Sequence, residues 1–184
     1  MTTRTRSRIY VSIAATILTA ALAVPATAQT SCTDLDFAPG CFRGTFQGQD
    51  AHDTLQPDPT SVVIRTTATG VGTRLGRFSL DREIVGNLLN LSDSGSAEWV
   101  AANGDSIYTT VVGQAEPSDL PGGFLKVTET HTITDGTGRF TEAQGSFCVE
   151  LFHRLEASGA AGGVETHDVF GSFHGTITFR AAGR

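Results

Sequence analysis

Eight short segments of the chain are rich in Val, Ile, Thr and aromatic residues, and Gly, Pro, Asn or Asp bounds each of them. They cover residues 41–48, 61–69, 74–86, 96–103, 106–114, 124–134, 145–155 and 167–179. β-Branched and aromatic residues favour strands, and the bounding residues favour turns. A helical period is almost absent after residue 28. The pattern therefore predicts an all-β fold of about eight strands.

The connections between these segments predict that neighbouring strands are antiparallel. Asn103 and Gly104 tolerate positive φ and suit a tight hairpin. The longer connections carry proline and small or charged residues, as surface loops do. Such strands either close into a barrel or split into the two sheets of a β-sandwich. We favour the barrel, because closure removes exposed strand edges and the strand order is a simple meander.

Period-two alternation is clearest in the last two segments and shows which face is buried. The residues predicted to share one packed face are Phe147, Val149, Leu151, Val169, Phe173 and Ile177. Leu155 and Phe179 continue the same pattern. Eight strands enclose an interior that side chains fill or that holds one small ligand.

The first 28 residues have the pattern of a cleavable signal peptide. Three arginines precede an uncharged stretch from Ile9 to Val24, and Ala26 and Ala28 are the small residues that signal peptidase requires. A stretch of about 16 apolar residues is shorter than the roughly 20 that span a bilayer. We therefore expect cleavage after Ala28 and no membrane anchor afterwards. The mature chain, 29–184, is then one secreted or periplasmic barrel domain that begins with a short cysteine-containing loop.

Charge argues against nucleic acid as a partner. Removing the three arginines of the signal peptide changes the formal net charge from −6 to −9. The remaining basic residues are scattered and form no run. A phosphate-binding surface needs clustered positive charge, so we expect no nucleic-acid partner.

The three cysteines suggest one disulfide in an exported protein. Cys32 and Cys41 are nine positions apart in a loop with Pro39 and Gly40, so we expect a bond between them. Cys148 lies in an apolar strand pattern and is expected to be a buried free thiol.

One segment carries a family resemblance. Residues 136–147 have the sequence GTGRFTEAQGSF. The segment resembles the G-T-G-x-F-x-x-A-x-G signature of dirigent proteins and allene oxide cyclase-like barrels, including secreted bacterial members. Its motif residues are Gly136, Gly138, Phe140, Ala143 and Gly145. We expect the glycines to allow a tight connection between two strands, with Phe140 and Ala143 packed against the barrel.

The resemblance implies a fold and a class of ligand. In the plant families the barrel cavity receives an apolar or phenolic substrate. Their catalytic residues do not match positions here one by one, so no catalytic residue is assigned. The sequence also carries no dinucleotide-binding loop or P-loop, and we expect no cofactor.

The histidines predict no metal site. His131, His153 and His167 have inward parity, but His131 belongs at the opposite end of its strand from the other two. The separation is on the order of 10 Å or more at about 3.3 Å per residue. His52 and His174 lie among polar residues and are expected at the surface.

Glu129 and His131 share the apolar parity of their strand, about 7 Å apart along it. One interpretation is that this face turns outwards, or that Glu129 pairs with an arginine such as Arg77 or Arg82. The other is a polar anchor in a ligand pocket. For a ligand-binding barrel we expect contacts from Glu129 and His131, with Trp99 as an aromatic wall between small neighbours.

Three functions follow from these expectations. The first is a non-catalytic secreted barrel that binds a small apolar ligand. The second is an isomerase or cyclase of the allene oxide cyclase type. The third is a structural or interaction protein with a filled barrel. We favour the first.

Overall fold

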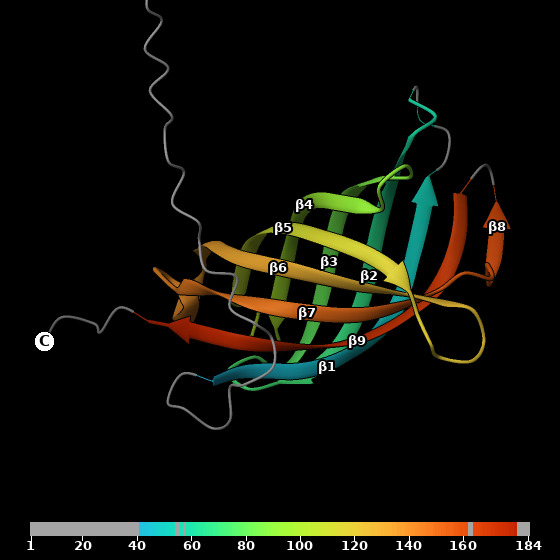
Figure 1. The fold of residues 1–184 in the computed structure, drawn as a ribbon. Helices are drawn as coiled ribbons and strands as arrows, with labels where there is room; N and C mark the ends of the chain where they lie inside the picture. The colour runs from blue at the N-terminus through green and yellow to red at the C-terminus, as the bar shows by residue number, and fades with distance from the viewer. Residues whose placement is uncertain (1–40, 54–55, 57, 162–163, 180–184) are drawn as a thin grey trace, which may run out of the picture. The chain divides into compact units, whose positions relative to one another are not determined.

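The computed structural model describes residues 41–53, 56, 58–161 and 164–179 (Figure 1). Its strands are β1 (Cys41–Asp53), β2 (Ser61–Gly72), β3 (Gly76–Asn87), β4 (Ser92–Ala101), β5 (Ser106–Pro117), β6 (Phe124–Gly136), β7 (Gln144–Arg154), β8 (Gly159–Ala161) and β9 (Val164–Thr178). A short 3-10 helix, η1 (Gly138–Phe140), connects β6 to β7. The predicted all-β fold is confirmed, since each of the eight expected segments contains a strand.

The sheet closes into an antiparallel barrel of eight strands. The strand order is β1-β2-β3-β4-β5-β6-β7-β9, and β9 pairs with β1 along thirteen residue pairs from Cys41–Thr176 to Asp53–Val164. The remaining strand, β8, is three residues long and pairs with β9 outside the barrel (Figure 1). The barrel, and not the β-sandwich, is the architecture of the chain.

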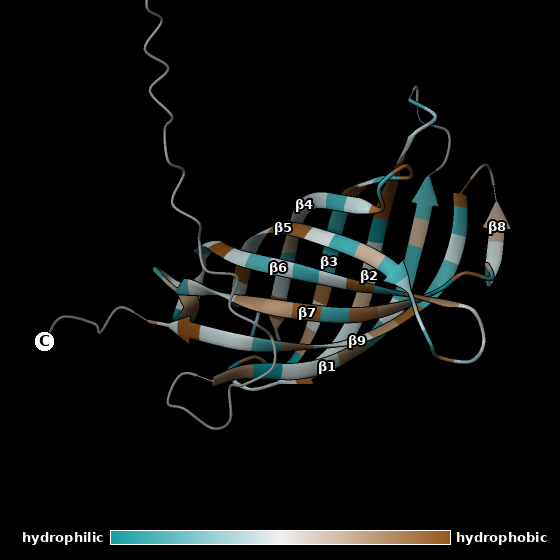
Figure 2. Cartoon of the chain, in the orientation of Figure 1, coloured by the Kyte–Doolittle hydropathy of each residue, from teal (hydrophilic) through white to brown (hydrophobic). Residues whose placement is uncertain are grey.

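Apolar and polar residues alternate along most strands (Figure 2). The six residues predicted to share a packed face, from Phe147 to Ile177, are all buried. Leu155 and Phe179 depart from the pattern, because both lie just beyond their strands and are exposed. The alternation therefore identified the inner face correctly within the strands, and failed where the strands end.

We name the two ends of the barrel by the strands that end there. The open end is where β1, β3, β5 and β7 finish, and the closed end is where these four strands begin. The rings of Phe42, Phe147, Phe173 and Trp99 pack in the interior, with the centroids of contacting rings 4.8 to 5.8 Å apart. Large aromatic side chains therefore fill part of the barrel.

The 136–147 motif covers the closed end. Phe140 and Ala143 are buried, as expected. A Cβ at Gly136 would lie 2.2 Å from the Phe140 carbonyl oxygen, so only glycine allows η1 to approach β6 this closely. Gly138 has a φ of +54°, a left-handed conformation that glycine adopts without strain. The motif is therefore structural, as predicted, and lies far along the strands from the open end.

The cysteines do not follow the expected pairing. Cys41 is a free thiol, so the predicted Cys32–Cys41 disulfide is wrong. Cys148, expected to be free, is disulfide-bonded. The separation of nine positions along the chain was a poor guide, because Cys41 is the first residue of β1 and its pairing depends on where the sheet places each cysteine. Cys32 and the predicted signal peptide lie outside the described residues.

No helix among the described residues is both long and apolar enough to cross a membrane.

Candidate functional site

A cavity of about 270 Å³ lies inside the barrel at the open end. Its apolar wall includes Val62, Ile64, Ile84, Leu88, Leu91, Ala115, Leu125, Val127, Leu151 and Leu155. Its polar lining includes Asp50, His52, Arg82, Asp93, His153, Glu165 and His167. A concave, mainly apolar chamber with a few converging polar groups is typical of a small-molecule site.

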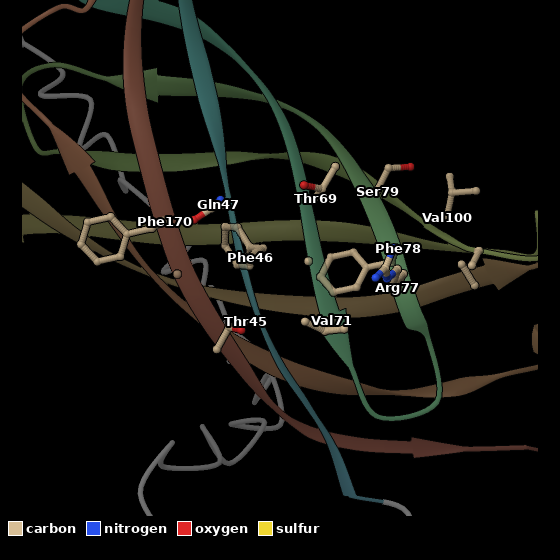
Figure 3. A pocket seen from close by; sticks show the side chains of 14 residues that line it. Thr45, Phe46, Gln47, Thr69, Val71, Arg77, Phe78, Ser79, Val100 and Phe170 are labelled. Carbon is tan, nitrogen blue, oxygen red and sulfur yellow. The ribbon is translucent and has the colours of Figure 1, made fainter.

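A second, larger hollow lies over β9, β1, β2, β3 and β4 (Figure 3). Exposed residues such as Thr45, Gln47 and Thr69 line it together with the buried rings of Phe46 and Phe78. Its lining contains no histidine or carboxylate, and Arg77 is its only charged group. It offers no group for acid–base or metal chemistry, so the candidate site is the cavity at the open end.

Arg82 on β3 is the centre of a buried ionic network at the cavity floor. It is 5% exposed and donates to Glu129 Oε1 through Nη1, and to Thr66 Oγ1 through Nε at 2.9 Å. Its Nη2 lies 3.7 Å from Asp50 Oδ1, and the Thr66 hydroxyl donates to the same oxygen. Four strands thus contribute to one polar network. Glu129 pairs with an arginine, Arg82, as the first interpretation of the sequence proposed.

The three residues expected to contact a ligand lie together in the interior. Glu129 and His131 are fully buried on β6, and His131 Nε2 lies 3.0 Å from Glu129 Oε2. The Trp99 ring contacts that of His131 edge-on, with centroids 5.5 Å apart. None of the three is among the described residues that line the cavity. Their direct contact with a ligand stays a prediction, and of the three only Glu129 contacts Arg82 directly, with His131 bonded to Glu129.

The pKa values in the network follow from burial and opposite charge. Burial alone would raise the pKa of Glu129, but the Arg82 charge and the hydrogen bond from His131 hold it below its usual range. Burial would also raise the pKa of Asp50, but His153 and Arg82 lower it. Burial lowers the pKa of His131 although Glu129 opposes the shift. The network therefore holds two carboxylates ionised beside one guanidinium.

Asp93 on β4 is the exception among the carboxyl groups. Burial and the nearby Glu129 charge raise its pKa to about 7, although Arg82 opposes the shift. It is 8% exposed, and its buried Oδ1 has no hydrogen-bond partner among the described residues. A carboxyl group in this state can donate or accept a proton near neutral pH.

Three histidines meet on one wall of the cavity. They are His52 on β1, His153 on β7 and His167 on β9, and their ring centroids lie 4.5 to 4.6 Å apart. Burial and the neighbouring His153 lower the pKa of His52 to about 4. The prediction of a surface position for His52 is wrong, because β1 continues to Asp53 and directs it inwards.

The sequence reasoning missed Asp50, His52 and Asp93 as site residues. The signal for the first two was available: they continue the inward parity of Phe42 and Phe46. The expected segment 41–48 stops short of them because polar residues interrupt the apolar pattern there. Asp93 was missed for the same reason, since β4 begins at Ser92 and not at residue 96.

Comparisons with known proteins add little to this geometry. No protein-family model matches the sequence, and no curated protein matches it. The solved structure of a pterocarpan synthase dirigent protein is similar with a TM-score of 0.38 and 11% identity. The match covers 78% of this chain and 98% of the dirigent chain. The likeness is too weak to carry an argument about the site, and the barrel fold rests on the strand pairing described above.

Proposed function

We propose that the barrel binds a small molecule with an apolar body and a hydrogen-bonding head group in the open-end cavity. The main support is that the apolar chamber contains buried polar atoms without hydrogen-bond partners among the described residues. These are Asp93 Oδ1, His52 Nε2 and His167 Nε2. An unsatisfied buried polar atom costs about 1–3 kcal/mol, which a ligand hydroxyl would relieve.

The size and the charge of the chamber restrict the ligand. A volume of about 270 Å³ is at the small end of ligand pockets, so the ligand is of fragment size. Arg82 already faces Glu129 and Asp50, so the floor does not require an anion. A neutral, hydroxylated aromatic or aliphatic compound suits this lining best.

Calorimetric titration with a panel of such compounds tests this proposal. Ala115→Phe places a ring in the chamber away from the ionic network, and it should weaken binding by at least about tenfold, or about 1.4 kcal/mol. Val112→Phe is the matched control, because Val112 lies on the same strand but is exposed on the outside. If no compound binds, or if Ala115→Phe binds as the wild type does, the proposal is wrong.

A second candidate is an acid–base isomerase or cyclase, which the raised pKa of Asp93 favours. A carboxyl group with a pKa of about 7 can move a proton within a bound substrate. Asp93→Asn should then abolish turnover of a bound compound while leaving its affinity within a few fold. A bound compound that the wild type leaves unchanged would support the binding role alone.

We also propose that the protein is exported, on the basis of the signal peptide pattern in residues 1–28. Expression of the full chain with N-terminal sequencing of the product should find Gln29 first. A full-length product retained inside the cell would contradict this.

A further inference from the structure

The three histidines at the open end have the geometry of a metal site. Each offers a ring nitrogen, and the three nitrogens lie within 4.8 Å of one another. A tetrahedral Zn²⁺ site with Zn–N bonds of about 2.0–2.1 Å separates its ligand nitrogens by about 3.4 Å. Small rotations of the rings would bring the three nitrogens from within 4.8 Å of one another to this separation. The residues come from three adjacent strands, β7, β9 and β1, which form a rigid base.

The second hydrogen-bonding position of two of these rings is already occupied. His153 Nδ1 lies 3.1 Å from Asp50 Oδ2, and His167 Nδ1 lies 2.9 Å from the Arg154 carbonyl oxygen. Both partners are acceptors, so Nδ1 carries the proton in each ring and Nε2 presents a lone pair. Metal-binding histidines are held by the same contacts, a carboxylate or a carbonyl on the remote nitrogen.

Two of the inward nitrogens have no hydrogen-bond partner among the described residues. His167 is 4% exposed, and its Nε2 is buried without a hydrogen-bond partner among the described residues. The Nε2 of His52 is in the same state. A buried nitrogen left unpaired is costly, and a cation bound between the three rings would satisfy both of these nitrogens together.

Glu165 lies next to the three histidines at the mouth of the cavity, through which an ion could enter. Glu165 Oε2 lies 3.6 Å from His167 Nε2, and its side chain is half exposed at the mouth of the cavity. It is placed to bind the cation as a fourth ligand or to accept a hydrogen bond from a metal-bound water.

We propose that His52, His153 and His167 bind one Zn²⁺ ion, with Asp50 orienting His153 and the fourth coordination position directed into the cavity. Three neutral imidazoles suit zinc among the common divalent ions, and three-histidine sites keep a fourth position for water or a ligand. The ion would give the cavity a point of attachment for an oxygen, nitrogen or sulfur donor. The inference does not depend on the proposed small-molecule function, because an ion can bind without an organic ligand.

The test uses the full chain without a polyhistidine tag, freed of metal by chelation. Titration with Co²⁺ should produce the visible absorption of a four-coordinate ion and saturate at one ion per chain. Zn²⁺ should displace it and should raise the melting temperature with concentration, as a ligand of the folded state does.

Variants distinguish this site from adventitious binding. His52 is half-buried at the mouth of the cavity, so the His52→Ala variant should fold. It should weaken Co²⁺ binding by more than about 100-fold, because losing even a residue that only orients a ligand costs about 10–100-fold in metal affinity. His167→Ala should weaken Co²⁺ binding to the same extent. Asp50→Asn, which changes the residue that orients His153, should weaken it by about 10–100-fold. The control is His174→Ala, a histidine on β9 that does not belong to the cluster.

Two results would overturn the proposal. One is the absence of saturable Co²⁺ or Zn²⁺ binding to a folded wild-type chain. The other is binding that His52→Ala and His167→Ala leave unchanged, or that His174→Ala reduces equally. Binding of Zn²⁺ without any organic ligand would leave the metal site intact even if the small-molecule function failed.

Discussion

Replacing Glu129 with glutamine tests the ionic network below the cavity. Glu129 is fully buried, and its carboxylate accepts a hydrogen bond from Arg82 Nη1, which is almost as buried. The substitution keeps the shape and one accepting oxygen but removes the negative charge. Among the described residues, the ion pair left to Arg82 would be that with Asp50, at 3.7 Å.

The expected loss of stability is about 3 kcal/mol. Breaking a buried ion pair by neutralising one partner costs about 3–5 kcal/mol, because the other charge stays buried. The remaining contacts of Arg82 with Asp50 and Thr66 place the cost at the lower end. For a domain of this size, about 3 kcal/mol lowers the melting temperature by roughly 6–12 °C.

The control is Glu83→Gln, in the pair between Glu83 and Arg65. In that pair Arg65 Nε lies 2.8 Å from Glu83 Oε2, but the Glu83 and Arg65 side chains are 61% and 56% exposed. Exposed pairs contribute about 0.2–1 kcal/mol. Urea unfolding of the two variants and the wild type measures both effects. Equal losses for Glu129→Gln and Glu83→Gln would refute the reasoning that burial makes this network important.

Three further predictions concern the cavity, the core and the cysteines. The folded pKa of Asp93 is raised to about 7, so between about pH 4 and 7 the folded chain holds a proton that the unfolded chain has lost. Its contribution to the free energy of unfolding is therefore full at low pH and is lost as pH rises through this window. Asp93→Asn should remove this fall in the free energy of unfolding with pH, measured by urea unfolding. An unchanged pH dependence in the variant would contradict the prediction. Phe173→Ala removes a ring packed on Phe42 and Trp99 and should cost about 3–5 kcal/mol, whereas a loss below about 1 kcal/mol would show a poorly packed core. Thiol labelling and peptide mapping of the unreduced, denatured protein should find Cys41 free and Cys148 in a disulfide; labelled Cys148 would contradict this.

Much of the fold was predictable because the inner face of a barrel leaves a period-two pattern. Phe147, Val149 and Leu151 alternate with outward residues, so both the strand and its buried face follow from the sequence. The 136–147 connection was predictable because its glycines and Phe140 have specific conformational roles.

The site was less predictable because its residues are polar and inward. Asp50 and His52 looked like the start of a surface loop, although their parity matched the core residues of β1. The burial of Asp50 is offset by Arg82 from β3 and His153 from β7, each of which lies two strands away from β1 in the sheet. Such pairs join residues far apart in the chain, and a single sequence does not indicate them. The comparison of His131, His153 and His167, which predicted no metal site, left out His52 for the same reason.

The most direct test of the central claim is a crystal structure of the protein soaked with its best-binding hydroxylated compound. We predict electron density for the compound inside the open end of the barrel, with its apolar body against Ile84 and Val127 and its hydroxyl within hydrogen-bond distance of Asp93. Density found only on the outer wall, or an open end filled by the protein's own side chains, would contradict the account.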